Sequence, residues 1–333
     1  MRRISADGIQ SAEEYKMQED CEFYLGMDGG GTKTECVLLA KYPNGFLQEK
    51  SRFCVSGINY NSYSKEQIRT ALLEIGEKVE KALSGVQKLT GIGIGAAGIS
   101  NPKAIPFLRK CVEEAGFSCT CEICGDDRAA LIGAVGAGRG ILLISGTGSV
   151  CLASDGAGHF YRAGGWGHLI DDAGSAYSIG RDILRAVVRA ADGRGSKTSL
   201  SRAVMEYLQI SGIQQLIAYV YAPETSKKGM AKISALLDAA LEQEDEAAIC
   251  IAQNAVNELM ELIKAVSRQI NTENDGEGQK IALITGGGVL LNNRYIRELL
   301  EKKLAEEHPD IVLTAPERDA AYGAAMLAAG RQK

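Results

Sequence analysis

Residues 28–34 read Asp-Gly-Gly-Gly-Thr-Lys-Thr and directly follow the apolar run 23–27. Consecutive glycines let the backbone turn sharply and bring its N–H groups close to an anionic ligand, while hydroxyls and a lysine add further donors. The expected phosphate-binding residues are Gly30, Gly31, Thr32, Lys33 and Thr34. The spacing is not that of a Walker loop, and a glycine-rich hairpin without a ligand is the alternative interpretation.

Asp28 stands where the first strand should end. A carboxylate in that position can face a hydrated Mg²⁺ rather than the phosphate itself. The sequence therefore predicts that Asp28 holds magnesium through water, beside a nucleotide triphosphate.

Two further glycine turns follow buried strands. Residues 145–149 read Ser-Gly-Thr-Gly-Ser, so Gly146, Thr147 and Gly148 again combine glycines with hydroxyls. The third turn is a glycine triplet that begins with Gly286 and Gly287. It carries no hydroxyl or charge, and so suits packing against a flat base or ribose. Each turn is a weak signal alone, but the three together predict a nucleotide site.

Asp126 and Asp127 stand between a predicted strand and a predicted helix. One of them could be the base that accepts a proton from a substrate hydroxyl. Aspartate is also a favoured helix N-cap residue, so both interpretations stay open at this point.

The stretch 164–175 surrounds the only tryptophan of the chain, Trp166, with glycines and carboxylates. An aromatic ring suits the apolar face of a sugar, and carboxylates suit its hydroxyls. Asn59 follows an earlier strand and could bind vicinal hydroxyls. The alternatives are a tryptophan that covers the core, with His168 as a structural histidine, and an ordinary turn asparagine.

Bulk properties exclude several classes of protein. The chain has 333 residues, 45% of them hydrophobic, and a formal net charge of −5, so no basic surface for nucleic acid is expected. No apolar run is long enough to span a membrane, and the polar N-terminus does not resemble a secretory signal. Nine cysteines then imply reduced thiols and a cytoplasmic protein. Cys119, Cys121 and Cys124 could form part of a metal site but are better explained by packing.

The element order predicts an α/β protein. Apolar patterns and turn residues indicate strands at 23–27, 35–40, 48–55, 91–96 and 119–123, with helices at 65–83, 102–115 and from 128. A second cycle has strands at 140–144, 150–154, 281–285 and 311–313, with helices at 174–191, 199–270, from 293 and at 317–329. The repeated strand–glycine turn–strand order predicts two lobes of related plan with a cleft between them.

At this point the assembly resembles N-acetylglucosamine kinase-like proteins of the BadF/BadG/BcrA/BcrD ATPase family. The motifs that carry the resemblance are DGGGTKT, GDDRAAL, LISGTGS, GGWGHLIDDAGSAYSIG, ITGGGVLLNN and PERDAAYGAA. The GGWGH motif is specific, whereas DGGGT and SGTGS are shared across the actin, hexokinase and heat-shock ATPase superfamily. The resemblance implies two ribonuclease-H-like lobes with ATP and Mg²⁺ in the cleft between them.

The resemblance also implies roles for individual residues. Thr32 and Thr147 match phosphate-contacting threonines, and Asp127 matches the catalytic aspartate. Sugar-contacting positions are matched by Asn59, Trp166, Gly167 and Asp172. The adenosine turn is matched by Gly286 and Gly287.

One motif departs from the family pattern. The usual Gly-Asp-Glu-Gly-Ser is replaced by Asp171-Asp172-Ala173-Gly174-Ser175, so the glutamate is lost at Ala173. We therefore expect a site that is more permissive at the substituents of the sugar.

The leading hypothesis is ATP-dependent phosphorylation of an amino sugar, N-acetylglucosamine to its 6-phosphate, by a cytoplasmic homodimer. The alternatives are an ATPase that activates a 2-hydroxyacyl-CoA dehydratase or benzoyl-CoA reductase partner, and a catalytically inactive sugar sensor. The expected organisation is an extension at 1–21, lobes at 22–137 and 138–316, and a final helix at 317–331 that can pack on either lobe.

Overall fold

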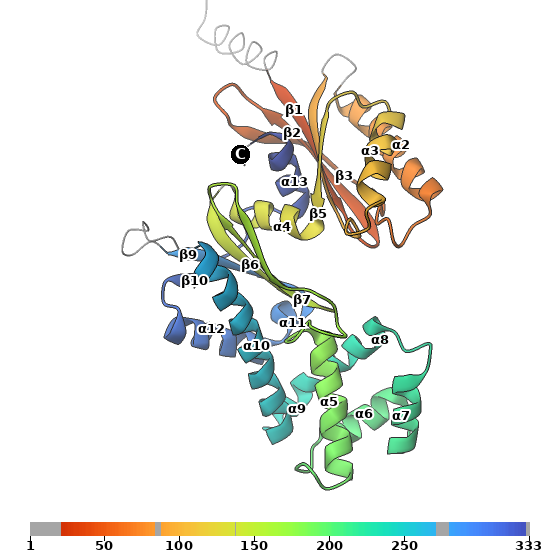
Figure 1. Ribbon diagram of the computed structural model, residues 1–333, viewed down its shortest axis with the longest axis vertical. Coiled ribbons are helices and arrows are strands. Elements are labelled where there is room, and N and C mark those ends of the chain that lie inside the picture. Colours follow the sequence, from red (N-terminus) through yellow and green to blue (C-terminus); the bar gives the residue numbers. More distant parts are fainter. Residues whose placement is uncertain (1–20, 84–87, 137, 271–279, 331–333) are drawn as a thin grey trace, which may run out of the picture. The chain divides into compact units, whose positions relative to one another are not determined.

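The computed structural model in Figure 1 describes residues 21–83, 88–136, 138–270 and 280–330. The chain forms two compact units that are divided after Ala137 and again before Pro316, so the last helix belongs to the first unit. The expected N-terminal extension lies outside the described residues except for Cys21. No helix in the described part is both long and apolar enough to cross a membrane.

The first unit is built on a five-stranded mixed sheet of order β3-β2-β1-β4-β5. The first three strands form an antiparallel meander, and β4 and β5 run parallel to β1. The strands are β1 (Glu22–Gly29), β2 (Lys33–Lys41), β3 (Leu47–Ser56), β4 (Leu89–Ala96) and β5 (Thr120–Gly125). The helices of this unit are α2 (Lys65–Ala82), α3 (Ala104–Glu114), α4 (Asp126–Val135) and α13 (Ala320–Ala328).

The two faces of this sheet carry different helices (Figure 1). Phe23, Leu25 and Met27 alternate along β1 and share one core with buried residues of α2 and α3. The opposite face is covered by α13 and α4. Gly26 allows this close packing, because a Cβ there would lie 2.0 Å from the carbonyl oxygen of Ala321 in α13. The final helix is therefore fixed against the strand that leads into the first glycine turn.

The second unit repeats the plan of the first. Its sheet has the order β10-β9-β6-β7-β8, again with an antiparallel meander of three strands followed by two parallel strands. The strands are β6 (Arg139–Ser145), β7 (Ser149–Asp155), β8 (Phe160–Gly164), β9 (Ile281–Gly286) and β10 (Ile311–Leu313). The duplication predicted from the two glycine turns is thus confirmed in strand order and direction.

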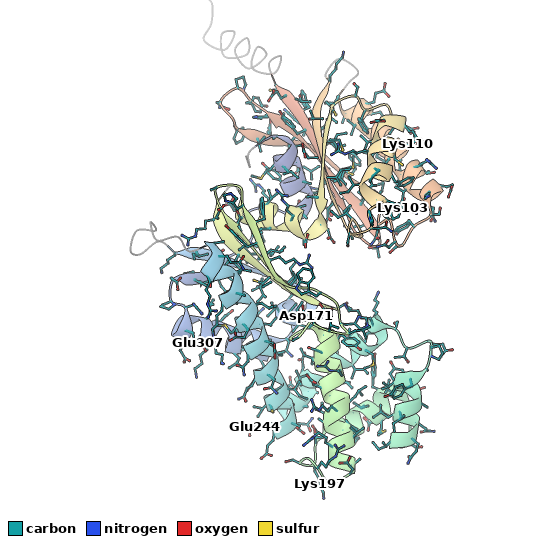
Figure 2. All side chains as sticks on the ribbon, in the orientation of Figure 1. Lys103, Lys110, Asp171, Lys197, Glu244 and Glu307 are labelled. Atoms are coloured by element: carbon teal, nitrogen blue, oxygen red, sulfur yellow. The ribbon has the colours of Figure 1, made fainter. Side chains whose placement is uncertain are left out.

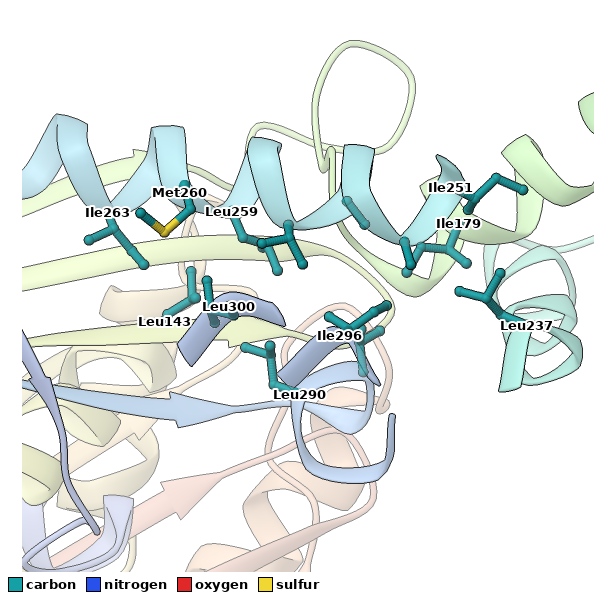
Figure 3. Packing of buried hydrophobic residues seen from close by; sticks show 14 of the residues in the cluster. Leu143, Ile179, Leu237, Ile251, Leu259, Met260, Ile263, Leu290, Ile296 and Leu300 are labelled. Carbon is teal, nitrogen blue, oxygen red and sulfur yellow. The ribbon is translucent and has the colours of Figure 1, made fainter. Parts of the chain in front are cut away.

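Helices make up most of the second unit. They are α5 (Ala176–Ala191), α6 (Leu200–Leu208), α7 (Ile213–Tyr221), α8 (Lys227–Lys232), η1 (Ile233–Leu236), α9 (Leu237–Glu242), α10 (Glu246–Ile270), α11 (Gly288–Asn292) and α12 (Arg294–Glu307). Leu259, Met260 and Ile263 of α10 point toward the side that carries Leu143 and Leu300 (Figure 3). One continuous apolar core therefore joins α10 to the sheet and to α12.

Two elements differ from the prediction. The strand β8 was not expected, because its five residues lack the alternation of apolar and polar side chains that marks a strand. None of these residues is fully buried. The final helix begins at Ala320 rather than at 317. Asp319 is its N-cap, and the amides of Glu317 and Arg318 donate to carbonyls of α4 instead.

Candidate functional site

The first glycine turn joins β1 to β2 at residues 30–32. Gly31 and Thr32 are exposed, and a Cβ at Gly31 would meet nothing within 4 Å. The hydroxyl of Tyr63 donates to the carbonyl oxygen of Thr32 at 3.1 Å, which ties the turn to the segment that follows β3. The backbone of the turn and the Thr32 hydroxyl are thus accessible to a ligand, as predicted for a phosphate-binding turn.

The prediction for Thr34 was wrong in this structure. Its side chain is fully buried, and its hydroxyl donates to the carbonyl oxygen of Ser56 at 2.9 Å, because β2 points this residue into the sheet. Lys33 points outward, and its ammonium pairs with Glu35 at 3.0 Å. The turn therefore offers a lysine that already has a carboxylate partner.

Asp28 lies at the centre of a group of carboxylates. Partial burial, followed by the charges of Asp126, Glu35 and Asp319, raises the pKa of Asp28 to about 6. Excess negative charge of this kind favours a divalent cation. No three His, Cys, Asp or Glu side chains in the described part converge closely enough to hold a metal directly. A carboxylate in such surroundings can hold a hydrated Mg²⁺ through water, and this role of Asp28 stays a prediction.

Asp126 and Asp127 form the first turn of α4. The N-cap residue is Gly125, and no side chain caps this helix, so the capping interpretation of the two aspartates was wrong. The carboxylate of Asp127 lies against Gly125, where a Cβ would come within 2.2 Å of Oδ1. Both aspartates are half-buried, and the Oδ1 atoms of Asp126 and Asp127 accept the amides of Asp127 and Arg128 at 3.0 and 2.8 Å. An ionised Asp127 can accept a proton.

Asn59 is half-buried in the turn after β3. Its Oδ1 accepts the amide of Asn61 at 2.9 Å, and its carbonyl accepts the amides of Ser62 and Tyr63. The residue thus shapes the turn that Tyr63 links to the first glycine turn. This contact places Asn59 in the same region of the first unit as Thr32.

The second glycine turn is held from below by the loop before α5. Ser145 Oγ donates to the carbonyl of Gly174 at 2.8 Å, and Ser149 Oγ donates to the carbonyl of Ala173 at 2.7 Å. Thr147 at the tip remains exposed. The two serines of the motif are therefore structural, whereas Gly146, Thr147 and Gly148 present backbone and hydroxyl groups to a ligand.

The third glycine turn packs directly on the second. Gly287 has a φ of +87°, and a Cβ there would lie 2.3 Å from the carbonyl oxygen of Ser145. Only glycine fits this approach. Beside the joined turns is a cavity of about 440 Å³. Its polar lining consists of Gly146, Thr147, Lys228, Lys232, Ser234, Asp238, Gly288, Asn292 and Asn293. Gly286 and Gly287 support the cavity, and Gly288 lines it.

Trp166 stands on an exposed loop between β8 and α5. The side chain is 68% exposed, and the guanidinium of Arg162 lies 5.3 Å from the ring centroid. The carboxylate of Asp171, labelled in Figure 2, accepts the amide of Trp166, and the carbonyl of Gly167 accepts the amide of Asp171. Trp166 therefore does not cover the core, whereas His168 packs edge-on against Tyr177.

The location of the Asp172 side chain does not match the predicted role of a carboxylate that contacts the sugar. Its side chain is almost fully buried and pairs with the ammonium of Lys227 at 2.7 Å. A Cβ at Gly148 would come within 2.8 Å of Asp172 Oδ2, so the ion pair supports the second glycine turn from beneath. Lys227 was missed, since 55 residues separate it from its partner and no motif marks it.

The three cysteines of the 119–124 segment lie in or next to β5. Partial burial raises the pKa of Cys119, Cys121 and Cys124, the latter two to about 11. Their thiols are therefore protonated at neutral pH and act as small apolar side chains.

Each unit thus gathers its own set of predicted residues. The first unit groups the first glycine turn, the carboxylates and Asn59. The second unit groups two glycine turns, a cavity and the tryptophan loop.

The sequence profile of the BadF/BadG/BcrA/BcrD ATPase family matches residues 25–328. The chain is 30% identical over 308 residues to an N-acetylmuramic acid/N-acetylglucosamine kinase of Clostridium acetobutylicum, covering 92% of this chain and 98% of the relative. It is 32% identical over 323 residues to the N-acetyl-D-glucosamine kinase of Dictyostelium discoideum, with coverages of 94% and 99%.

The fold has matching solved structures. A Chromobacterium violaceum protein assigned provisionally as an N-acetylglucosamine kinase superposes with a TM-score of 0.67, at 23% identity, covering 92% of this chain and 98% of that one. At this identity the likeness shows the fold, and it agrees with the predicted pair of ribonuclease-H-like lobes. The chain belongs to the BadF/BadG/BcrA/BcrD ATPase family.

Proposed function

We propose that the protein is an ATP-dependent kinase of an amino sugar, with N-acetylglucosamine as the main substrate and its 6-phosphate as the product. The observation that carries this proposal is the similarity, over more than nine-tenths of the chain, to two curated kinases of this class. The accessible glycine turns and the carboxylate beside one of them supply the groups that phosphoryl transfer requires.

In this proposal the nucleotide is bound at all three glycine turns. The cavity beside Gly146 and Gly288 holds the adenosine, with Lys228 and Lys232 on the opposite side. Its volume falls within the range of small-molecule sites. The exposed residue Thr147 then binds the phosphates at the tip of the second turn. The first turn contributes Gly30, Gly31 and Thr32 to the same phosphates.

Asp127 is the proposed general base. It accepts the proton of the sugar hydroxyl as that oxygen bonds to the γ-phosphorus, while the bond from this phosphorus to the β–γ bridging oxygen breaks and ADP leaves. Asp28 holds Mg²⁺ through water, and the ion supplies positive charge against the triphosphate.

The sugar subsite is proposed to consist of Asn59, Trp166 and Gly167. Trp166 is the only tryptophan, so its fluorescence reports on this subsite alone. We expect N-acetylglucosamine to shift the emission, because the exposed indole would stack on the apolar face of the ring. An unchanged spectrum at saturating sugar would remove Trp166 from the subsite.

Ala173 suggests a broader substrate range than N-acetylglucosamine alone. The family motif has glutamate at this position, and alanine removes an acceptor and leaves room. The clostridial relative is named for both N-acetylmuramic acid and N-acetylglucosamine. We therefore propose that the enzyme also accepts an amino sugar that bears a lactyl group.

The test is an assay of ADP release over a panel of amino sugars, with mass spectrometry of the products and the variant Asp127→Asn as the blank. We expect phosphosugar from N-acetylglucosamine and from N-acetylmuramic acid. Activity on N-acetylglucosamine alone would overturn the broader range but not the kinase. Steady ATP hydrolysis without any phosphosugar would overturn the kinase and favour the activator ATPase.

A further inference from the structure

The second unit has a further cavity, which is lined by residues of α5, of α10 and of the loop before α5. Its volume is about 510 Å³, which exceeds the 440 Å³ of the proposed adenosine cavity. One wall is a face of α5 and the other a face of α10. The principal side chains of the two walls are Arg181, Arg185, Arg189, Cys250, Asn254 and Asn257. We call this cavity the arginine groove.

Three arginines stand four residues apart along one face of α5. One such step advances about 6 Å along a helix, and like charges at this spacing destabilise a helix by about 0.2–0.5 kcal/mol per pair. Arg181 pairs loosely with its neighbour Asp182 at 3.6 Å, and Arg189 donates to the carbonyl of Arg194. Among the described residues, the structure gives Arg185 no ion pair or hydrogen bond. The row of charge is therefore incompletely neutralised, in a chain whose net charge is −5.

The opposite wall is polar but nearly uncharged. Asn254 and Asn257 of α10 present amide groups, and Glu258 provides the single carboxylate of that wall. The floor includes Ala186, Ile251 and Ala255, which are small or apolar. Guanidinium forks on one side, amides on the other and a small floor suit a ligand that carries both an anion and hydroxyl groups.

The upper end of the arginine groove is the loop that supports the second glycine turn. Ala173 and Gly174 line the groove, and their carbonyls accept the hydroxyls of Ser149 and Ser145. Gly174 also lies against α10, where a Cβ would come within 2.8 Å of the carbonyl oxygen of Ala255. A ligand that changes the separation of α5 and α10 would therefore act on the loop beneath the phosphate-binding turn.

We propose that the arginine groove binds a small phosphorylated sugar and that its occupancy alters nucleotide binding. The phosphate pairs with Arg181 and Arg185, and the hydroxyls bind Asn254 and Asn257. The groove volume lies within the range of small-molecule sites. The binding part is independent of the proposed kinase activity, whereas the effect on nucleotide rests on the assignment of the second glycine turn.

Binding is tested by isothermal titration calorimetry with glucose 6-phosphate and with N-acetylglucosamine 6-phosphate. Saturating N-acetylglucosamine and a non-hydrolysable ATP analogue are present, so that the proposed active site is filled. We expect one site with a millimolar or lower Kd, weakened at least tenfold in Arg185→Ala and partly restored in Arg185→Lys. Arg202→Ala is the matched control, since Arg202 is an exposed arginine on α6 outside the groove.

Two results would overturn the site. One is the absence of heat from both sugar phosphates at millimolar concentration. The other is an equal Kd in the native protein and in Arg185→Ala. Sedimentation velocity completes the test, because a dimer that dissociates in Arg185→Ala would show that a second copy of the chain covers the groove.

The effect on nucleotide is measured separately, as the Kd of the ATP analogue with and without the sugar phosphate. We expect at least a threefold change in the native protein and none in Arg185→Ala. Equal nucleotide affinity in the presence of bound sugar phosphate would overturn the regulatory part. Because no turnover is measured, loss of the kinase assignment and loss of this site are distinguishable.

Discussion

The two hydroxyl-bearing glycine turns have similar sequences but different supports. The turn at 30–32 stands open at the end of a hairpin, beside the carboxylates of Asp28 and Glu35. The turn at 146–148 is bonded by two serines to the loop before α5 and touches the third glycine turn. The Asp172–Lys227 pair lies beneath it.

This difference in support indicates that the two turns have different roles. The open turn at 30–32 lies in the region of Asp28 and Asp127, which we propose to hold a metal and to accept a proton. The turn at 146–148, which we call the buttressed turn, lies beside the cavity that we propose to hold the nucleotide. Changes in the first unit should therefore affect turnover, and changes in the second unit should affect stability and nucleotide affinity.

The largest expected effect concerns the first unit. Asp127→Asn keeps the shape of the side chain but removes the proton acceptor, so we expect kcat to fall by about a hundredfold or more with little change in stability. Asp126→Asn is the matched control and should retain most activity. Steady-state kinetics of both variants decide the matter, and a dead Asp126→Asn beside an active Asp127→Asn would reverse the assignment.

The second effect concerns the ion pair beneath the buttressed turn. Lys227→Ala leaves the buried carboxylate of Asp172 without its partner, and we expect a loss of about 3 kcal/mol in the free energy of unfolding. The double variant Lys227→Ala/Asp172→Asn should recover part of the loss, since asparagine tolerates the positive φ of this position.

Lys228→Ala supplies the control from the same helix. Lys228 lines the proposed adenosine cavity, so its loss should weaken nucleotide binding without this destabilisation. Urea unfolding of the three variants is the measurement. Equal stability of Lys227→Ala and the native protein would show that the ion pair does not support the turn.

A third test compares the glycines of the two turns directly. Gly148→Ala would place a Cβ 2.8 Å from a carboxylate oxygen of Asp172, and we expect about 2 kcal/mol of destabilisation together with weaker nucleotide binding. Gly31→Ala meets nothing within 4 Å and should change stability by less than about 0.5 kcal/mol. Thermal unfolding of both variants suffices, and equal losses would erase the distinction between open and buttressed turns.

Local patterns predicted the parts of the site that local sequence controls. Glycine turns next to hydroxyl side chains can be recognised in a sequence, because the flexible backbone and the hydrogen-bond donors lie within a few residues of each other. The repetition of these turns predicted the duplicated sheets. Thr34 was misassigned although its pattern was readable. It shares strand parity with Cys36 and Leu38, so it lies on the face of the sheet that packs against α2 and α3.

Long-range partners could not be predicted in the same way. Lys227 lies in a helix of six residues, and 55 residues separate it from Asp172. No local sequence pattern near either residue therefore predicts this ion pair. The arginine groove likewise needs α5 and α10 to lie together. The spacing of its arginines is visible in the sequence, but the wall opposite them is not.

The smallest expected effect is the pH dependence of the carboxylate beside the open turn. The pKa of Asp28 is raised from 3.8 to about 6, so between these values the folded protein binds more protons than the unfolded chain. Stability must then fall as pH rises through this window, and the cost is complete above pH 6.

Asp28→Asn removes the ionisable group, so the variant should be more stable than the native protein at pH 7. The full shift corresponds to about 3 kcal/mol, and partial exposure of the group reduces the expected gain to about 1 kcal/mol. The gain should shrink as the pH falls toward 4 and vanish only near pH 3, below the ordinary pKa of 3.8, where Asp28 is largely protonated in both states. Urea unfolding at pH 4, 5.5 and 7 measures the difference.

The same variant should need more Mg²⁺ for half-maximal activity, because a neutral amide attracts a hydrated cation less strongly than a carboxylate does. A stability gain together with a raised Mg²⁺ requirement would show that the carboxylate of Asp28 lowers the stability of the fold but serves the function of the protein. If Asp28→Asn is instead less stable at pH 7, the carboxylate is a structural acceptor, and the open turn loses its proposed role in holding the metal.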